Sequence, residues 1–197
     1  MGEGWWSGKG AEGTGEYKRR STMSIRSFCG WKILSSMVER CPTKIEKGLI
    51  ATLFETGGRA SEVLSLEGAQ FHDKGKYILI TGMLVLKQRD IGQSYRQVAM
   101  MKSDALVKPM MDWVGEVGEG KLFSYGYDWL YKQVIGADKD WWPHRFRGER
   151  ASQLAVEHDF GVLNLMRWFG WTSEHMAAHY AKMSVKELVE KMSRGQL

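Results

Sequence analysis

The chain has 197 residues, a hydrophobic content of 43% and nine tryptophans, which is enough to bury one globular core. Its sequence contains no run of about 18 apolar residues, as a membrane-spanning helix requires, and no signal-peptide pattern. Two cysteines, Cys29 and Cys41, do not make a disulfide framework, so we expect a reducing intracellular compartment, the cytoplasm or nucleoid, and no membrane partner.

The positive charge is concentrated in the first half of the chain. Residues 1–100 contain 15 Lys and Arg against 10 Asp and Glu, whereas residues 101–197 contain 13 of each. The net charge of +5 is compatible with a polyanionic partner such as nucleic acid. Many ordinary proteins are equally basic, so the motifs must carry the functional argument.

The N-terminal residues show little regular pattern. Residues 1–22 are rich in glycine, which predicts a flexible arm or a remnant of an expression vector. Residues 23–41 are expected to form a linker with a short helix from about Ser24 to Arg40, because a partial apolar face recurs there.

A second helix is expected to begin at Pro42, since a proline in the first helical turn leaves no N–H unpaired. Gly57 and Gly58 end this helix, because glycine readily adopts the left-handed conformation found at helix C-termini. Arg59 is thereby placed directly after the helix.

Short strands follow, and the pattern is then helical to the end of the chain. The expected strands are Tyr77–Thr81 with Met83–Lys87, and Tyr95–Met101. The expected helices are Leu106–Val117, Tyr127–Ile135, His144–His158, Val162–Phe169, Ser173–Ala181 and Val185–Arg194. We therefore predict an α+β, mainly helical domain over residues 42–183 with one small antiparallel sheet.

Two arginines, a histidine and a tyrosine suggest phosphodiester chemistry. His144 and Arg147 are three residues apart at a helix start that Pro143 favours, so their side chains share one face. Guanidinium groups at Arg59 and Arg147 could hold two phosphate oxygens and offset charge that builds up during attack. Tyr180 would be the nucleophile. An unperturbed phenol has a pKa of about 10, so it needs a positive field and a base, for which His144 is the candidate.

Trp171 precedes Tyr180 by nine residues, which would place the two half a turn out of phase on one continuous helix. They could converge if Gly170 and Trp171 form a loop and a new helix starts near Ser173. The indole N–H is a donor only, so Trp171 could stabilise a phosphate oxygen but could not accept a proton.

These motifs together resemble the catalytic domain of the tyrosine recombinases, the phage-integrase type. The segment from Thr56 to Leu66 matches T-G-x-R-x-S-E-x-x-x-L, and His144 with Arg147 matches H-x-x-R. The segment from Gly170 to Tyr180 matches G-[HW]-[ST] followed by a tyrosine nine residues after the His or Trp. The resemblance covers about residues 42–190.

The resemblance implies a site-specific recombinase or integrase that needs no metal, ATP or other cofactor and forms a 3′-phosphotyrosyl link to DNA. It assigns phosphate binding to Arg59 and Arg147, proton transfer to His144, hydrogen bonding to Trp171 and nucleophilic attack to Tyr180. A supporting role at the acidic position falls to Glu62.

The family also uses a lysine of the β-hairpin as general acid. Lys87 is the expected residue, with Lys76 and Arg89 as alternatives.

Assembly is the third implication. Residues 184–197 carry a capping box and an apolar stripe, so we expect a tail helix that docks on a neighbouring protomer of a DNA-bound homotetramer or on its own domain. The 41 residues before Pro42 are too few for the family's N-terminal DNA-clamping domain. Two other functions stay open: relaxation alone, as in type IB topoisomerases, and DNA binding without catalysis by a regulator or orphan catalytic fragment.

Overall fold

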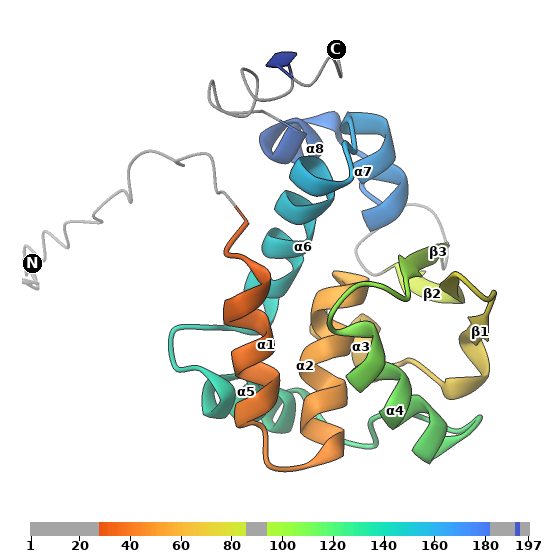
Figure 1. Cartoon of the computed structure of the whole chain (residues 1–197). Coiled ribbons are helices and arrows are strands. Elements are labelled where there is room, and N and C mark those ends of the chain that lie inside the picture. Colours follow the sequence, from red (N-terminus) through yellow and green to blue (C-terminus); the bar gives the residue numbers. More distant parts are fainter. Residues whose placement is uncertain (1–27, 86–93, 182–191, 194–197) are drawn as a thin grey trace, which may run out of the picture.

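The computed structural model describes residues 28–85, 94–181 and 192–193. Within these residues the chain forms eight α-helices, a short 3-10 helix at Gly68–Gln70 and a three-stranded sheet (Figure 1). The helices are α1 (Trp31–Arg40), α2 (Lys44–Thr56), α3 (Ala60–Leu64), α4 (Val107–Val117), α5 (Tyr127–Ala137), α6 (Pro143–Glu157), α7 (Val162–Phe169) and α8 (Glu174–Ala181). The strands are β1 (Phe71–Asp73), β2 (Tyr77–Val85) and β3 (Ser94–Met101).

Helix α2 is the centre of the fold. Its N-terminus is closed by a capping box, in which the Thr43 hydroxyl accepts from the Glu46 N–H and the Glu46 carboxylate accepts from the Thr43 N–H. Residues 48–56 are all buried, because α1, α4 and α6 pack around this helix (Figure 1). Pro42 therefore precedes the cap and is not in the first helical turn, which corrects the predicted start.

The sheet is antiparallel with the order β1-β2-β3. Pairing of β2 with β3 shifts register between Ile80 and Met83, and Gly82 adopts a φ of 66° at this irregularity. The predicted pair of strand segments is thus one continuous strand with a bulge. In β3, burial alternates residue by residue, so one face of this strand points into the core.

Helices α6, α7 and α8 form the other side of the domain. Pro143 is the first residue of α6, where its ring fits the helical φ angle. Helices α7 and α8 pack against each other and against α6, and α7 also contacts β3 (Figure 1). Helix α7 therefore lies beside the sheet, and its C-terminal end lies close to the end of α2.

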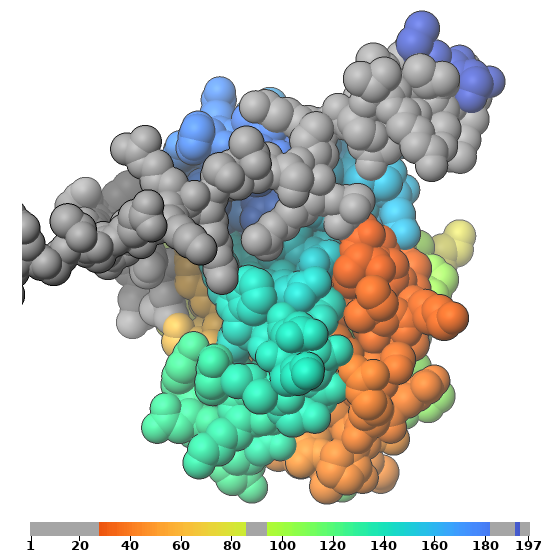
Figure 2. All heavy atoms as spheres, turned by 90° about the vertical axis from the view of Figure 1, so that its left-hand side faces the viewer, coloured from red at the N-terminus to blue at the C-terminus, as the bar shows by residue number. Residues whose placement is uncertain are grey.

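Helix α1 joins the domain through α2 and α5. The Arg40 guanidinium donates to the Ala137 carbonyl at 2.9 Å and pairs with Asp138 at 3.1 Å. Figure 2 shows the N-terminal helical segment next to the segment of α5 and α6 on one face. The described chain thus has the predicted mainly helical α+β architecture, although β1 and α3 were not predicted.

Candidate active site

The turn between α2 and α3 carries Arg59. Gly57 ends α2 in the left-handed conformation with a φ of 55°. A Cβ atom at this position would lie 2.4 Å from the Phe169 ring, so the turn also leaves no space for a side chain. Arg59 then occupies the N-cap position of α3, and its side chain is 24% exposed. The helix end, the tight turn and the next helix together place this arginine at the edge of the core.

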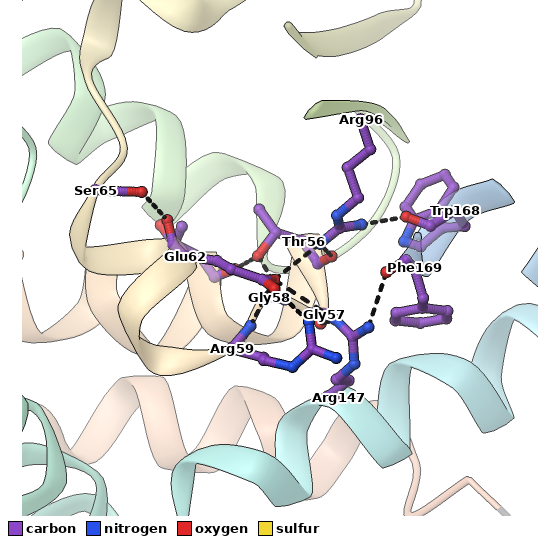
Figure 3. A network of polar contacts seen from close by, with 11 residues as sticks. Thr56, Gly57, Gly58, Arg59, Glu62, Ser65, Arg96, Arg147, Trp168 and Phe169 are labelled. Atoms are coloured by element: carbon purple, nitrogen blue, oxygen red, sulfur yellow. Dashed lines mark hydrogen bonds and ion pairs between the residues drawn. The ribbon is translucent and has the colours of Figure 1, made fainter. Parts of the chain in front are cut away.

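Glu62 is the acidic centre of the site. It is fully buried, and its carboxylate accepts from the Arg59 N–H at 2.9 Å and from Arg59 Nη1 at 2.5 Å. The same carboxylate lies 3.7 Å from a guanidinium nitrogen of Arg96 and 3.7 Å from one of Arg147 (Figure 3). Three guanidinium groups share one carboxylate, which leaves this cluster with a formal excess of two positive charges.

Arg147 comes from the first half of α6 and is 2% exposed. Its Nη1 donates to the Gly57 carbonyl at 2.7 Å, and its Nη2 donates to the Phe169 carbonyl at 2.8 Å (Figure 3). These carbonyls lie at the C-terminal ends of α2 and α7, where the helix dipole is negative and favours a cation. Arg147 thus ties together two helix ends that are far apart in sequence.

Arg96 makes the same kind of connection from the sheet. It occupies an inward position of β3, is 6% exposed, and donates from Nη2 to the Thr56 carbonyl at 3.2 Å. Its Nη1 donates to the Trp168 carbonyl (Figure 3). Arg96 therefore bridges the same two helix ends as Arg147, one residue earlier in each.

Burial lowers the pKa of both inner arginines. The pKa of Arg147 falls to about 9, chiefly through desolvation and further through Arg96 and Arg59, while Glu62 and Tyr180 act in the opposite direction. Desolvation likewise lowers the pKa of Arg96 to about 10, against the influence of Glu62. Both groups stay positively charged at neutral pH, and an added anion would favour their charged forms.

A short loop between α7 and α8 carries Trp171. Gly170 ends α7 with a φ of 64°, and a Cβ atom there would approach the Val85 side chain to 2.9 Å. Helix α8 then begins at Glu174, so Trp171 and Tyr180 belong to different elements, as the sequence predicts.

This break allows the aromatic rings to converge. Trp171 stacks on Phe169 with ring centroids 4.5 Å apart and on Tyr180 with centroids 5.6 Å apart. The Arg147 guanidinium carbon lies 4.8 Å from the Phe169 ring centroid and 5.4 Å from that of Trp171. The candidate nucleophile is thus linked to the arginine cluster through a column of stacked rings and interacts electrostatically with Arg147.

The candidate proton-transfer groups are described only in part. His144 is exposed in the first turn of α6, three residues before Arg147. Lys87 and Arg89, two candidates for the general acid, lie outside the described residues. Lys76 directly precedes β2, whereas Val85 beside Gly170 ends it, and a nine-residue strand spans about 25–30 Å. This separation argues against Lys76.

Three further predictions concern the tail helix, a metal site and a membrane span. Most of the expected tail helix at Val185–Arg194 lies outside the described residues. Among the residues that are described, no group of three or more His, Cys, Asp or Glu side chains could hold a metal ion. None of the helices in the described ranges is both long and apolar enough to cross a membrane.

Comparison with known proteins gives matches in structure and none in sequence. No protein-family model and no curated protein sequence matches the chain. The XerH site-specific recombinase bound to its difH substrate superposes with a TM-score of 0.63 at 19% identity, over 88% of this chain and 56% of that one. XerA recombinase gives a TM-score of 0.64 at 13% identity, over 88% and 66% of the two chains.

The catalytic domain of bacteriophage HP1 integrase superposes with a TM-score of 0.55 at 18% identity, over 85% of this chain and 94% of that domain. The chain spans little more than half the length of the XerH recombinase but nearly all of this isolated catalytic domain. It therefore has the fold of the catalytic domain of tyrosine recombinases and integrases.

The sequence predicted Arg59, Arg147, Trp171 and Tyr180 as residues of the site, but it did not predict Arg96. One signal was available, because Arg96 shares the inward face of a predicted strand with Val98 and Met100. An arginine at a core position of a strand needs partners, and here its partners are 40 and 72 residues away. Nothing local in the sequence indicates them.

Proposed function

We propose that this chain is the catalytic domain of a site-specific DNA recombinase or integrase, in which Tyr180 forms a 3′-phosphotyrosyl link to DNA. The observation that carries the proposal is the surplus positive charge at Glu62, whose single carboxylate pairs with both Arg59 and Arg147. This cluster is joined to Tyr180 through the ring of Trp171. The recombinase fold supports the same conclusion.

The surplus charge suits phosphoryl transfer. A DNA phosphodiester carries one negative charge, and attack by a phenolate adds a second in the pentacoordinate transition state. Positive groups fixed in a water-poor site stabilise charge that develops during a reaction far better than mobile solvent does. Arg59, whose side chain is partly exposed, is the group that an incoming phosphate would meet, and Arg147 would strengthen the field from the buried side.

The proposed reaction conserves the phosphodiester bond energy. The Tyr180 oxygen attacks phosphorus while the bond from phosphorus to the 5′-oxygen breaks, and His144 accepts the phenolic proton. The leaving 5′-oxygen takes a proton from Lys87. A free 5′-hydroxyl then attacks the phosphotyrosine in the reverse sense, which rejoins DNA and releases Tyr180. In this scheme Trp171 donates a hydrogen bond to a non-bridging oxygen.

Double-stranded DNA is the proposed partner, and a homotetramer on DNA is the proposed active assembly. The structurally similar XerH recombinase was determined bound to its difH substrate, and the similar Tn1549 transposon integrase was determined in complex with transposon right end DNA. Residues 184–197 would connect neighbouring protomers. Because phosphate contacts release counterions, binding by this chain should weaken steeply as salt concentration rises.

The first test is to mix supercoiled plasmid with the protein in EDTA, quench with detergent, and compare wild type with Tyr180→Phe. Relaxed plasmid or a protein-linked nick with wild type alone is the expected result. An adduct that persists in Tyr180→Phe would assign the nucleophile to another residue.

The same experiment separates the alternatives. Binding without an adduct in either protein would favour a DNA-binding role, and fusion to an N-terminal DNA-clamping domain would then show whether the clamp is what cleavage requires. Relaxation without strand exchange, unaffected by deletion of residues 184–197, would favour the topoisomerase-like reaction.

A further inference from the structure

Arg96 and Arg147 connect the same two segments at successive residues. Arg147 donates to the carbonyls of Gly57 and Phe169. Arg96 donates to those of Thr56 and Trp168. One arginine comes from a helix and the other from a strand, so the two clamps are independent in sequence. The ends of α2 and α7 are thereby held at two points, which restricts rotation as well as separation.

Each of these segments leads directly to a residue of the proposed site. Arg59 follows Gly57 by two residues, and Trp171 follows Phe169 by two residues. The distance between Arg59 and Trp171 therefore depends on how firmly the two helix ends are joined. A misplacement of about 1 Å at a reacting centre can lower a rate by about 10²-fold.

The charge of Arg96 is not needed to neutralise the core. It adds a third positive charge to a cluster with one carboxylate, and its Nε has no hydrogen-bond partner among the described residues. Buried ionic groups are often less stabilising than apolar residues of similar volume. With 6% of its surface exposed, Arg96 is also poorly placed to touch DNA itself.

We propose that Arg96 is a positioning residue for DNA cleavage, which sets the relative position of Arg59 and Trp171 by joining the ends of α2 and α7. This inference rests on the proposed cleavage reaction, but the clamp itself is a structural property that can be measured without it. Two nitrogens of Arg96 serve two carbonyls on different segments, so the fork of the guanidinium matters and not only its charge.

The activity test compares Arg96→Met, Arg96→Lys and Arg150→Met with wild type by the initial rate of protein-linked nicking of supercoiled plasmid. Arg150 is the matched control, since it is also a buried arginine and its ion-pair partners, Glu55 and Asp104, lie outside the site. Its guanidinium lies 5.5 Å from the Trp168 ring centroid but donates to neither of the carbonyls that Arg96 binds. Rates are compared at a temperature where near-ultraviolet circular dichroism shows each variant folded.

We expect Arg96→Met to nick about 10²-fold more slowly with plasmid affinity changed less than twofold. Arg96→Lys should stay within tenfold of Arg96→Met, because one ammonium nitrogen replaces two separate donors. Folded Arg150→Met should nick at the wild-type rate. A wild-type rate in either Arg96 variant would overturn the proposal, as would an equal loss in folded Arg150→Met.

A second measurement does not depend on activity. The indole N–H signal of Trp171 in a ¹H–¹⁵N spectrum, identified by its absence in Trp171→Phe, should move in Arg96→Met and in Arg96→Lys but not in Arg150→Met. A shift shared by both Arg96 variants reports position, because Lys keeps the charge. An unmoved signal would overturn the proposal, whereas a moved signal in a protein that never nicks DNA would overturn only the proposed function.

Discussion

Helix α6 carries two buried arginines, Arg147 and Arg150, whose networks have opposite charge balance. Arg147 shares the single carboxylate of Glu62 with two other arginines. Arg150, one turn later, pairs with Glu55 at 3.0 Å and with Asp104 at 3.4 Å. One network has surplus positive charge, and the other has one cation between two acids.

The Arg150 network can lose its excess negative charge by protonation of Glu55, whereas the network around Glu62 keeps its excess positive charge. Burial raises the pKa of Glu55 to about 7, with Arg150 acting against this shift, so Glu55 can take up a proton. Arg96 and Arg147, whose pKa values are about 10 and about 9, keep their protons at neutral pH. Buried charge without compensation is costly, so surplus positive charge indicates a site prepared for an anion. The Arg150 network becomes neutral once Glu55 takes up a proton, which indicates a structural role.

The largest effect should come from removing the structural arginine. Arg150→Met leaves Glu55 and Asp104 without their cation, and we expect the free energy of unfolding in urea to fall by about 3–5 kcal/mol. Lys108→Met, which removes an exposed pair with Asp112, is the control and should be unchanged within error. A loss in Arg150→Met no greater than in this control would remove the distinction between the two networks.

Removing Arg59 should lower the rate of DNA nicking strongly and the free energy of unfolding only a little. Arg59→Ala is expected to lower the rate of DNA nicking by about 10²–10³-fold, since it removes a charge-stabilising donor. Its partly exposed side chain should make the change in unfolding free energy smaller than that of Arg150→Met. Arg40→Ala, at an exposed pair with Asp138, should nick normally. Near-normal nicking by Arg59→Ala would contradict its role in binding phosphate.

The pH dependence of the free energy of unfolding should come from Glu55 in the Arg150 network. An ordinary glutamate titrates near 4.3, so the folded state, with the pKa of Glu55 at about 7, binds the proton more tightly than the unfolded state. This stabilisation is complete below about pH 4 and is lost as pH rises through 7. We expect wild type to lose about 1–3 kcal/mol between pH 5 and 8 relative to Glu55→Gln. Parallel profiles would show that Glu55 does not titrate in this range.

The smallest effect tests the indole donor. Trp171→Phe keeps a ring between Phe169 and Tyr180 but removes the N–H, so nicking should slow by about tenfold, the scale of one hydrogen bond to a charged group. Trp171→His restores a donor and should recover part of the rate. A loss as large as that of Arg59→Ala would mean that the indole ring itself holds Tyr180 in place.

Local signals in the sequence predicted most of the helices. Gly57 ends α2 and Pro143 begins α6 as expected, because each residue has a backbone preference that operates within one turn. Strand β1 and helix α3 were missed because they contain three and five residues, too few for a periodic pattern. The bulge at Gly82 made one strand look like two.

The candidate site shows the same limit at longer range. Arg59, Arg147 and Tyr180 could be predicted as site residues because each stands in a motif with fixed spacing. Arg96 has no such motif, since hydrogen bonding to Thr56 and Trp168 depends on how strand and helix ends meet in space. A residue in a motif of fixed spacing can be predicted from the sequence, whereas a residue whose partners lie far away along the chain is identified only from the fold.

Position 57 also has a consequence for protein engineering. Asn tolerates a left-handed backbone, yet any side chain at residue 57 would collide with the Phe169 ring. Residues 57 and 169 must therefore be varied together in a mutant library. If a smaller residue at position 169 restores DNA nicking to a variant with a side chain at position 57, the two positions are selected together.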